Sequence, residues 1–389
     1  MRIYLDHNAG SPLRPEPRAA IEKLMVDLPL ANPSSVHRSG QHARAALEHA
    51  RQSVARLIGA SARQIVFTSG GTEANNLAIF GAATGAGRKR IVSSTIEHSS
   101  VMTSVAELER RGFEIVRVAV DRDGWIDPAS VISKLSDTTA IVTLGLVNSE
   151  VGTIQNLAAL GAAIAGAGAL FHIDAVQALG RIPIDVAALS CDLMTLSGHK
   201  IGAPAGIGAL YIREPRVVGP VIFGGPQESG VRPGTPNLIG AVAFGAAASA
   251  LTDRLSEESA RVGSMTELLR HELHRQIPAL ILNGSENSRV PNTLNFTFPG
   301  VLGESLLMAL DLEGVEVSMG SACAAGAVEP SHVLLAMGRS RDEARSSLRL
   351  SLGWNTTVAD VERAADIIGR VWRRVNAAEP AEPVAEAAL

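Results

Sequence analysis

The feature that most constrains the fold is a regular alternation of short apolar runs with helix-like stretches between about Ser53 and Arg213. Seven such runs occur, and they read QIVFTS, RIVSST, FEIVRVAV, AIVTLGLV, ALFHIDAV, CDLMTLS and IGALYIR. Each run has the length of a strand, and a helix is the usual connection between parallel strands. The alternation predicts an α/β fold with a mostly parallel central sheet and helices on both of its faces.

The chain has 389 residues, which is more than one compact core usually supports. A long helical region is expected from about Leu238 to Gln276, and strands such as NTLNFTF and VEVSMG follow it. We expect a large α/β domain over residues 15–255 and a smaller α+β domain over 256–375, which the N-terminal segment 1–14 joins. The tail 376–389 is rich in Pro, Ala and Glu, and we expect it to be disordered.

The composition is that of an ordinary globular protein, with 46% hydrophobic residues and a net charge of -4. This charge gives no reason to expect nucleic acid as a partner. The N-terminus lacks the apolar stretch of a signal peptide, and the longest uncharged stretch, 151–173, is too weakly apolar for a membrane span. Two distant cysteines, Cys191 and Cys323, form neither a disulfide framework nor a metal-ligand pattern. We therefore expect a cytoplasmic protein that binds no metal and no membrane.

Polar residues follow the apolar runs, where ligands bind in open α/β sheets. They are Thr68 to Thr72, Glu97-His98, Asn148 to Glu150, Asp174 to Gln177, and Ser197 to Lys200. In FTSGGTEANN, a Gly-rich turn precedes a helix start at Thr72, which would direct free N–H groups at a phosphate. A tight turn without a ligand explains the same pattern.

Three side chains at these strand ends suggest a shared chemistry. Lys200 is either a surface charge or an amine that forms a Schiff base among phosphate donors. Asp174 ends an apolar run, so it either faces a cation such as a pyridinium nitrogen or caps the next helix. His98 is either structural or catalytic. Together with the Gly-rich turn, these residues are the parts by which proteins hold pyridoxal phosphate.

The two cysteines differ in their surroundings. Cys323 lies in VEVSMGSACAAG, a stretch of small residues that gives a thiol little apolar cover, which indicates either a working thiol or a harmless loop cysteine. Cys191 begins an apolar run and is interpreted as structural.

The sequence resembles the pyridoxal-phosphate cysteine desulfurases of the NifS and IscS type, within the class V aminotransferase group. The resemblance covers nearly all of the chain except the tail. It is carried, in family order, by NPSSVHRSG, FTSGGTEANNLAI, IEHSSV, HIDAVQ, SGHKIG, VRPGTPN, GSACAAG and PSHVLLAMG. It implies the fold type I of pyridoxal-phosphate transferases, with a mostly parallel sheet and a smaller α+β C-terminal domain.

The resemblance also implies roles for individual residues. Lys200 should bind the cofactor as an imine, Asp174 should face its pyridine nitrogen, and Gln177 should bond its phenolic oxygen. His98 should stack on the ring and assist proton transfer. The phosphate should be held by Gly71, Thr72, Ser197, His199 and, from a second subunit, Thr235. Substrate-binding residues should be Arg349, which clamps the carboxylate, with Asn148 and Ser149.

The implied reaction converts L-cysteine to L-alanine and leaves a persulfide on the nucleophile, Cys323. The implied partners are a second copy of the chain in a homodimer and a sulfur-acceptor protein, such as an iron–sulfur scaffold or a thiolation enzyme. Two positions depart from the family pattern: Ser149 stands where most relatives have Asn, and GAPAG at 202–206 lacks a second lysine. Selenocysteine lyase, another class V reaction and a non-catalytic paralogue remain as alternatives.

Overall fold

A computed structural model describes residues 2–27, 31–85, 87–214, 217–319 and 329–378. All seven apolar runs form strands of one sheet, in the order β2-β8-β7-β6-β5-β3-β4. β8 pairs antiparallel with β2 and β7, and the other neighbouring pairs are parallel, which confirms the predicted architecture. The strands are β2 (Ile65–Thr68), β3 (Arg90–Ser94), β4 (Glu114–Val118), β5 (Thr139–Gly145), β6 (Leu170–Asp174), β7 (Leu193–Ser197) and β8 (Gly208–Ile212).

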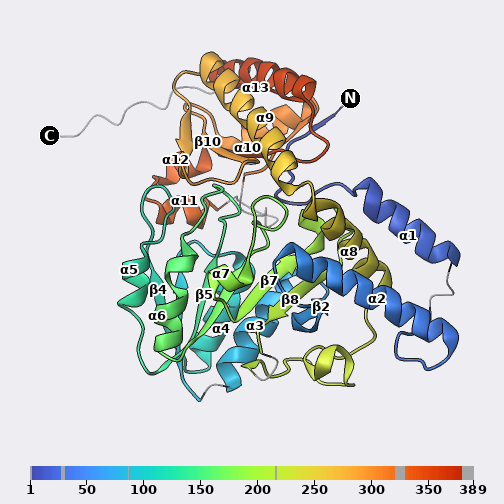
Figure 1. Ribbon diagram of the computed structural model, residues 1–389. Helices are drawn as coiled ribbons and strands as arrows, with labels where there is room; N and C mark the ends of the chain where they lie inside the picture. Colours follow the sequence, from blue (N-terminus) through green and yellow to red (C-terminus); the bar gives the residue numbers. More distant parts are fainter. Residues whose placement is uncertain (1, 28–30, 86, 215–216, 320–328, 379–389) are drawn as a thin grey trace.

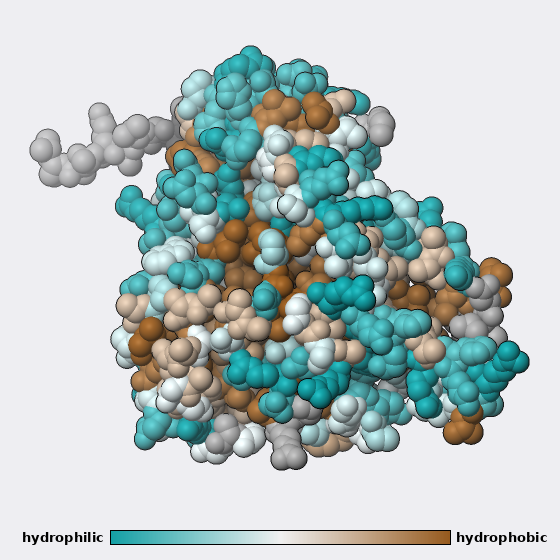
Figure 2. Space-filling model, in the orientation of Figure 1, coloured by the Kyte–Doolittle hydropathy of each residue, from teal (hydrophilic) through white to brown (hydrophobic). Residues whose placement is uncertain are grey.

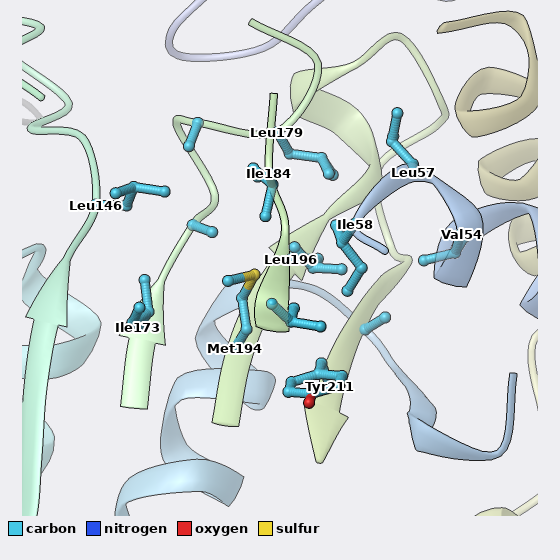
Figure 3. Close-up of a cluster of buried hydrophobic side chains, with 14 of the residues drawn as sticks. Val54, Leu57, Ile58, Leu146, Ile173, Leu179, Ile184, Met194, Leu196 and Tyr211 are labelled. Carbon is cyan, nitrogen blue, oxygen red and sulfur yellow. The ribbon is translucent and has the colours of Figure 1, made fainter. Parts of the chain in front are cut away.

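Helices cover both faces of this sheet (Figure 1). In β2, Ile65 and Phe67 pack into one core and Val66 packs into another, because successive side chains of a strand point to opposite faces. The first core also contains residues of α2 (Arg38–Leu57) and α8 (Leu238–Thr252), and Figure 3 shows part of it. The second contains residues of α3 (Gly71–Gly85) and α4 (Ser99–Arg110). The remaining helices of this part are α1 (Pro15–Asp27), α5 (Pro128–Ile132), α6 (Gly161–Gly166) and α7 (Val186–Leu189).

A smaller lobe lies at one end of the sheet (Figure 1). It contains a three-stranded antiparallel sheet, β12 (Ser347–Ser351), β10 (Thr293–Thr297) and β9 (Ile281–Asn283). Its helices are α9 (Leu255–Gln276), α10 (Gly303–Leu312), α11 (His332–Ala336), α12 (Arg341–Arg345) and α13 (Val358–Ala378). Figure 2 shows hydrophobic residues gathered between the two lobes.

The N-terminal segment packs with the smaller lobe. β1 (Ile3–Tyr4) pairs parallel with β11 (Val315–Glu316), and Ile3 and Leu5 belong to the same buried cluster as residues of α9, α10 and α13. This packing agrees with the expected role of residues 1–14, while the domain boundaries stay a prediction.

The expected helical region 238–276 is present as two helices, α8 and α9, which are bent by 80°, whereas the expected disorder of the tail needs correction. α8 packs on α1 and α2, whereas α9 packs on α13, so the two helices belong to different lobes. Of the tail 376–389, residues 376–378 continue α13, whose Ala-rich end favours the helix, and 379–389 lie outside the described residues.

No single helix in the described ranges is long and apolar enough to cross a membrane. α8 and α9 have the length and composition of a span only as a pair, across their bend.

Candidate functional site

A cavity of about 210 Å³ lies at the carboxyl ends of the parallel strands. Gly145, Asp174 and Ser197 line it from the ends of β5, β6 and β7. It brings together the following residues that the sequence predicted for the site: Gly71, Thr72, His98, Asn148, Ser149, Asp174, Gln177, Ser197, His199 and Lys200.

The turn before α3 is built by close backbone packing. α3 begins at Gly71, where a Cβ atom would lie 2.9 Å from the Cγ2 atom of Val176. A Cβ atom at Gly208 of β8 would lie 2.7 Å from Cα of Gly70, so the strand and the turn touch through their main chains. Glycine is therefore required on both sides, and the N-terminus of α3 lies open to the cavity.

Ser197 and His199 face the same end of the cavity. The Ser197 hydroxyl lies 2.9 Å from Nδ1 of His199. Burial lowers the pKa of His199 to about 4, and the charges of Lys200 and Arg181 act in the same direction. The imidazole is therefore neutral at pH 7, and it contributes hydrogen bonds rather than charge.

Asp174 is held by two donors at the end of β6. Its Oδ2 accepts a hydrogen bond from Nδ2 of Asn75 at 2.8 Å, and its Oδ1 accepts one from the Val176 N–H at 3.0 Å. The second bond fixes the turn that follows, as the capping interpretation expected, although no helix begins there. Asp174 nevertheless lines the cavity, so its carboxylate serves the turn and remains available to a ligand.

Lys200 follows β7 in a short 3-10 turn, Gly198–Lys200. Its Nζ donates to the carbonyl oxygens of Asn8 at 2.6 Å and Ala9 at 2.8 Å. Burial lowers the pKa of Lys200 to about 7, with Arg181 and Arg349 adding to the effect. A large share of the amine is therefore neutral near pH 7, and the neutral amine is the form that acts as nucleophile or base.

His98 precedes α4 and caps it. Its Nδ1 accepts the Ser100 N–H at 3.1 Å and lies 2.7 Å from the Ser100 hydroxyl. Burial lowers the pKa of His98, while the charge of Asp174 acts in the opposite direction. The ring is therefore fixed by Nδ1, and Nε2 is the nitrogen that the cap leaves for other contacts.

The predicted substrate residues lie beside this cavity. Arg349 of β12 donates from Nη1 to the Ser149 carbonyl at 3.1 Å and pairs through Nη2 with Asp6 at 2.7 Å. Its Nε is buried without a partner among the described residues. The Asn148 amide is engaged within its own turn, because it accepts from the N–H groups of Glu150 and Val151. Nε of Arg349 is therefore available as a donor to a ligand.

Arg349 and Thr235 are not among the residues that line the cavity. Thr235 lines a separate cavity with Ser69 and Arg232. Cys323 lies outside the described residues. Cys191 is fully buried, and burial raises the pKa of its thiol to about 12, which fits the structural interpretation.

Sequence reasoning did not assign three residues that shape the site. Asn75 and Glu97 line the cavity, and Asn8 supplies the carbonyl bound by Lys200. Burial, and secondarily Asp174, raise the pKa of Glu97 to about 7. Glu97 directly precedes His98, and Asn75 lies in the FTSGGTEANN motif. These sequence positions were the signals that could have identified both residues as part of the site.

Comparison with known proteins places this geometry in a family. The aminotransferase class-V model matches residues 3–364. The cysteine desulfurase IscS of Dictyoglomus turgidum is 40% identical over 380 residues, covering 97% of this chain and 96% of the relative. A solved NifS-like protein superposes with a TM-score of 0.90 at 30% identity, covering 96% of this chain and 100% of that one. The structure of SspA in complex with cysteine superposes with a TM-score of 0.79 at 32% identity, covering 90% and 99%.

These matches extend over both lobes, and they include the strand-end residues that form the cavity. The chain belongs to the aminotransferase class-V family, among its cysteine desulfurases.

Proposed function

We propose that this chain uses pyridoxal phosphate to convert L-cysteine into L-alanine and carries the released sulfur on Cys323. The observation that supports the proposal best is that Lys200 and Asp174 line one cavity beside the Gly71 turn. The cysteine complex of the similar SspA supports cysteine as the substrate.

The residues present fit pyridoxal phosphate. Gly71 lets the start of α3 pack closely, because a Cβ atom there would lie 2.9 Å from Cγ2 of Val176, and a phosphate is favoured at this helix N-terminus. Thr72, Ser197 and His199 add side-chain donors for the phosphate. Lys200 offers an amine and Asp174 a carboxylate, which suit the aldehyde and the pyridine nitrogen of the cofactor.

When bound, pyridoxal phosphate supplies an electron sink for the bond broken at the substrate α-carbon. Lys200 accepts the α-proton at Nζ, because its amine is partly neutral near pH 7. Asp174 provides a fixed negative charge that keeps a pyridine nitrogen protonated. Gln177 would hold the phenolic oxygen of the cofactor, and His98 would contact the cofactor ring and assist proton transfer.

Arg349 binds the substrate carboxylate. A guanidinium donates two parallel hydrogen bonds, which fix the carboxylate in one plane. Ser149 lines the cavity next to it and presents a hydroxyl where most relatives have an amide. We propose that this difference changes how tightly the substrate is held and not which bond is broken.

Cys323 acts as the sulfur acceptor. Its thiolate attacks the substrate sulfur, the Cβ–S bond of cysteine breaks, an S–S bond forms, and a proton at Cβ completes alanine. The described residues on either side of 320–328 support this role: Ser318 pairs with the main chain of Arg349, and His332 contacts the Glu97 carbonyl at 3.1 Å. Described residues on both sides of 320–328 thus lie close to residues of the proposed site.

We further propose that the chain works as a cytoplasmic homodimer, in which Thr235 completes the phosphate site of the partner subunit. A persulfide must be handed on, so a sulfur-acceptor protein such as an iron–sulfur scaffold is the expected partner. A reducing compartment suits a thiol that has to stay free between turnovers.

The test measures alanine and persulfide formation from L-cysteine with a reductant, while the visible absorption of the cofactor is recorded. Wild type is compared with Cys323→Ala and with the matched control Cys191→Ala. We expect cofactor colour in all three proteins, and persulfide in the wild type and the Cys191 variant only. L-selenocysteine is assayed in parallel.

Other outcomes point elsewhere. Colour without persulfide in any protein would support another class V reaction, and faster turnover of selenocysteine with no need for Cys323 would support a selenocysteine lyase. A colourless wild type after incubation with pyridoxal phosphate would support a non-catalytic paralogue.

A further inference from the structure

Arg181 is a buried cation without a carboxylate partner in the described part of the chain. It lies beyond the turn that follows β6, and 7% of its surface is exposed. The three hydrogen bonds of its guanidinium go to the main-chain oxygen of Gln177 at 2.7 Å, to Oε1 of Gln177, and to the His7 carbonyl at 3.4 Å. A buried charge that meets only neutral oxygens is costly, so its position calls for an explanation.

The first consequence concerns the Gln177 amide. Arginine can only donate, so Gln177 must turn Oε1 toward Arg181. Nε2 then points the other way and donates to the Asn8 carbonyl at 3.1 Å. The same carbonyl accepts from Nζ of Lys200 at 2.6 Å. Arg181 therefore sets the orientation of an amide whose donor side lies next to the lysine amine.

The second consequence concerns charge. The groups that face Lys200 come from the N-terminal segment, both lobes and its own turn, and they are Asp6, His98, Asp174, Arg181, His199 and Arg349. Burial is the largest cause that lowers the pKa of Lys200, and the charge of Arg181 is the next largest. Arg349 is paired with Asp6. Arg181 has no such counter-charge among the described residues, so its field at Lys200 is not cancelled by a partner.

We propose that Arg181 is a positioning residue with two tasks: it orients the Gln177 amide, and its charge, which has no counter-charge among the described residues, acts on the Lys200 amine across the small cavity that both residues line. The proposal rests on the function proposed above for Lys200 and Gln177. It explains why a guanidinium stays buried among carbonyl oxygens when an apolar side chain would fill the space at lower cost.

The charge is tested on cofactor-free, full-length protein without substrate. Lysines are labelled with trinitrobenzenesulfonate between pH 5 and 10, and each labelled peptide is quantified by mass spectrometry. The chain has only four lysines, and Lys23, Lys89 and Lys134 are exposed, so they serve as internal references for Lys200. Because no turnover is needed, the result does not depend on whether the chain is a desulfurase.

The variants separate charge from hydrogen bonding. Arg181→Met and Arg181→Gln remove the charge, and the glutamine keeps a donor in case the methionine variant does not fold. Arg181→Lys keeps the charge. Arg213→Met is the matched control, because Arg213 also donates to a main-chain carbonyl, that of Cys191, but it does not face Lys200.

We expect the wild-type labelling midpoint of Lys200 near pH 7. The neutral variants should raise it by about one pH unit, which means up to tenfold less labelling at pH 7. Arg181→Lys and Arg213→Met should keep the wild-type midpoint. An unchanged midpoint in Arg181→Gln would overturn the electrostatic task.

The orienting task is tested by binding of pyridoxal phosphate, followed by absorption. Arg181→Lys should weaken binding in the wild-type background and have no effect in a Gln177→Ala background, because there is no amide left to orient. An equal loss in both backgrounds would show that Arg181 does not act through Gln177.

Discussion

Nζ of Lys200 lies 2.6 Å from the main-chain oxygen of Asn8, a residue 192 positions away in the sequence. The Asn8 side chain forms hydrogen bonds with residues of other segments. Its Nδ2 donates to the Ser149 carbonyl at 3.1 Å and to Oγ1 of Thr293 at 2.9 Å, and its Oδ1 accepts from Asn292 at 3.0 Å. One buried asparagine of the N-terminal segment thus ties the lysine to the smaller lobe.

Replacing Asn8 by alanine should therefore destabilise the protein and also shift the main-chain carbonyl to which Lys200 donates. Three buried hydrogen bonds of about 1 kcal/mol each are lost, so the free energy of unfolding should fall by about 2–4 kcal/mol. Urea denaturation measures this loss. Asn76→Ala is the matched control, because the Asn76 side chain donates an exposed hydrogen bond to the Thr72 carbonyl of its own helix, and the variant should stay near wild type. Equal stability of the two variants would contradict the role assigned to Asn8.

Gly208→Ala should displace the phosphate turn. The added Cβ would lie 2.7 Å from Cα of Gly70 and 2.8 Å from the Leu196 carbonyl, and these main-chain atoms cannot move aside as a side chain can. We expect a stability loss of about 1–3 kcal/mol and weaker binding of pyridoxal phosphate, measured by absorption. Gly85→Ala, where nothing lies within 4 Å of the added atom, should bind the cofactor like wild type. Unchanged binding in Gly208→Ala would show that the turn tolerates displacement.

The sheet could be predicted from the sequence because its strands are buried on both faces and read as continuous apolar runs. β2 shows why this signal is reliable: Ile65, Val66 and Phe67 are all buried, two against one layer of helices and one against the other. The helical region 238–276 was also predictable from its composition, but the 80° bend between α8 and α9 was not. What separates them is packing on different lobes, a tertiary effect that no local pattern reports.

The site was predictable where a residue stands directly after a strand, as Asp174 and Lys200 do. Asn8 and Arg181 were not assigned, because their effects depend on tertiary contacts. The Asn8 carbonyl accepts a hydrogen bond from Lys200, and the Arg181 guanidinium donates one to Gln177. Asn148 shows the converse, since its position marked it for substrate while its amide is engaged in its own turn.

His172 should make the protein sensitive to mild acid. It is fully buried in β6 between the hydroxyls of Thr143 at 2.8 Å and Thr195 at 3.0 Å, and burial lowers its pKa from 6.5 to about 4. Between these values the unfolded chain binds the proton and the folded chain does not, so stability falls as the pH decreases. One such histidine costs about 2 kcal/mol between pH 7 and pH 5.

Urea denaturation at the two pH values measures this loss. His172→Gln should make the stability less dependent on pH, whereas the exposed His42→Gln should not change it. A pH dependence in His172→Gln as steep as in wild type would assign the acid sensitivity to other groups.

Arg349→Lys should weaken substrate binding more than it slows the chemistry. The lysine keeps the charge but loses the planar pair of donors that a carboxylate requires, so KM for L-cysteine should rise by roughly tenfold or more. Steady-state kinetics of alanine formation separates KM from kcat. Arg339→Lys, in the smaller lobe, bonds the Leu282 carbonyl and should leave both constants unchanged. A fall in kcat at constant KM would place Arg349 in the reacting centre and not in the clamp.

Mixing two inactive variants tests whether subunits share the site. Thr235 lines a cavity other than that of Lys200 in its own chain. Thr235→Ala and Lys200→Ala chains are unfolded together, refolded as a mixture, and assayed for alanine formation. If Thr235 completes the partner's phosphate site, half of the dimers are mixed and each has one intact site, so about a quarter of the wild-type activity should return. In the control, the Thr252→Ala chain is mixed with the Lys200→Ala chain. The Thr252 hydroxyl donates to the Ala248 carbonyl of its own helix, so this variant should be active before mixing. If the refolded mixture is no more active than the average of its components while dimers form, each chain completes its own site.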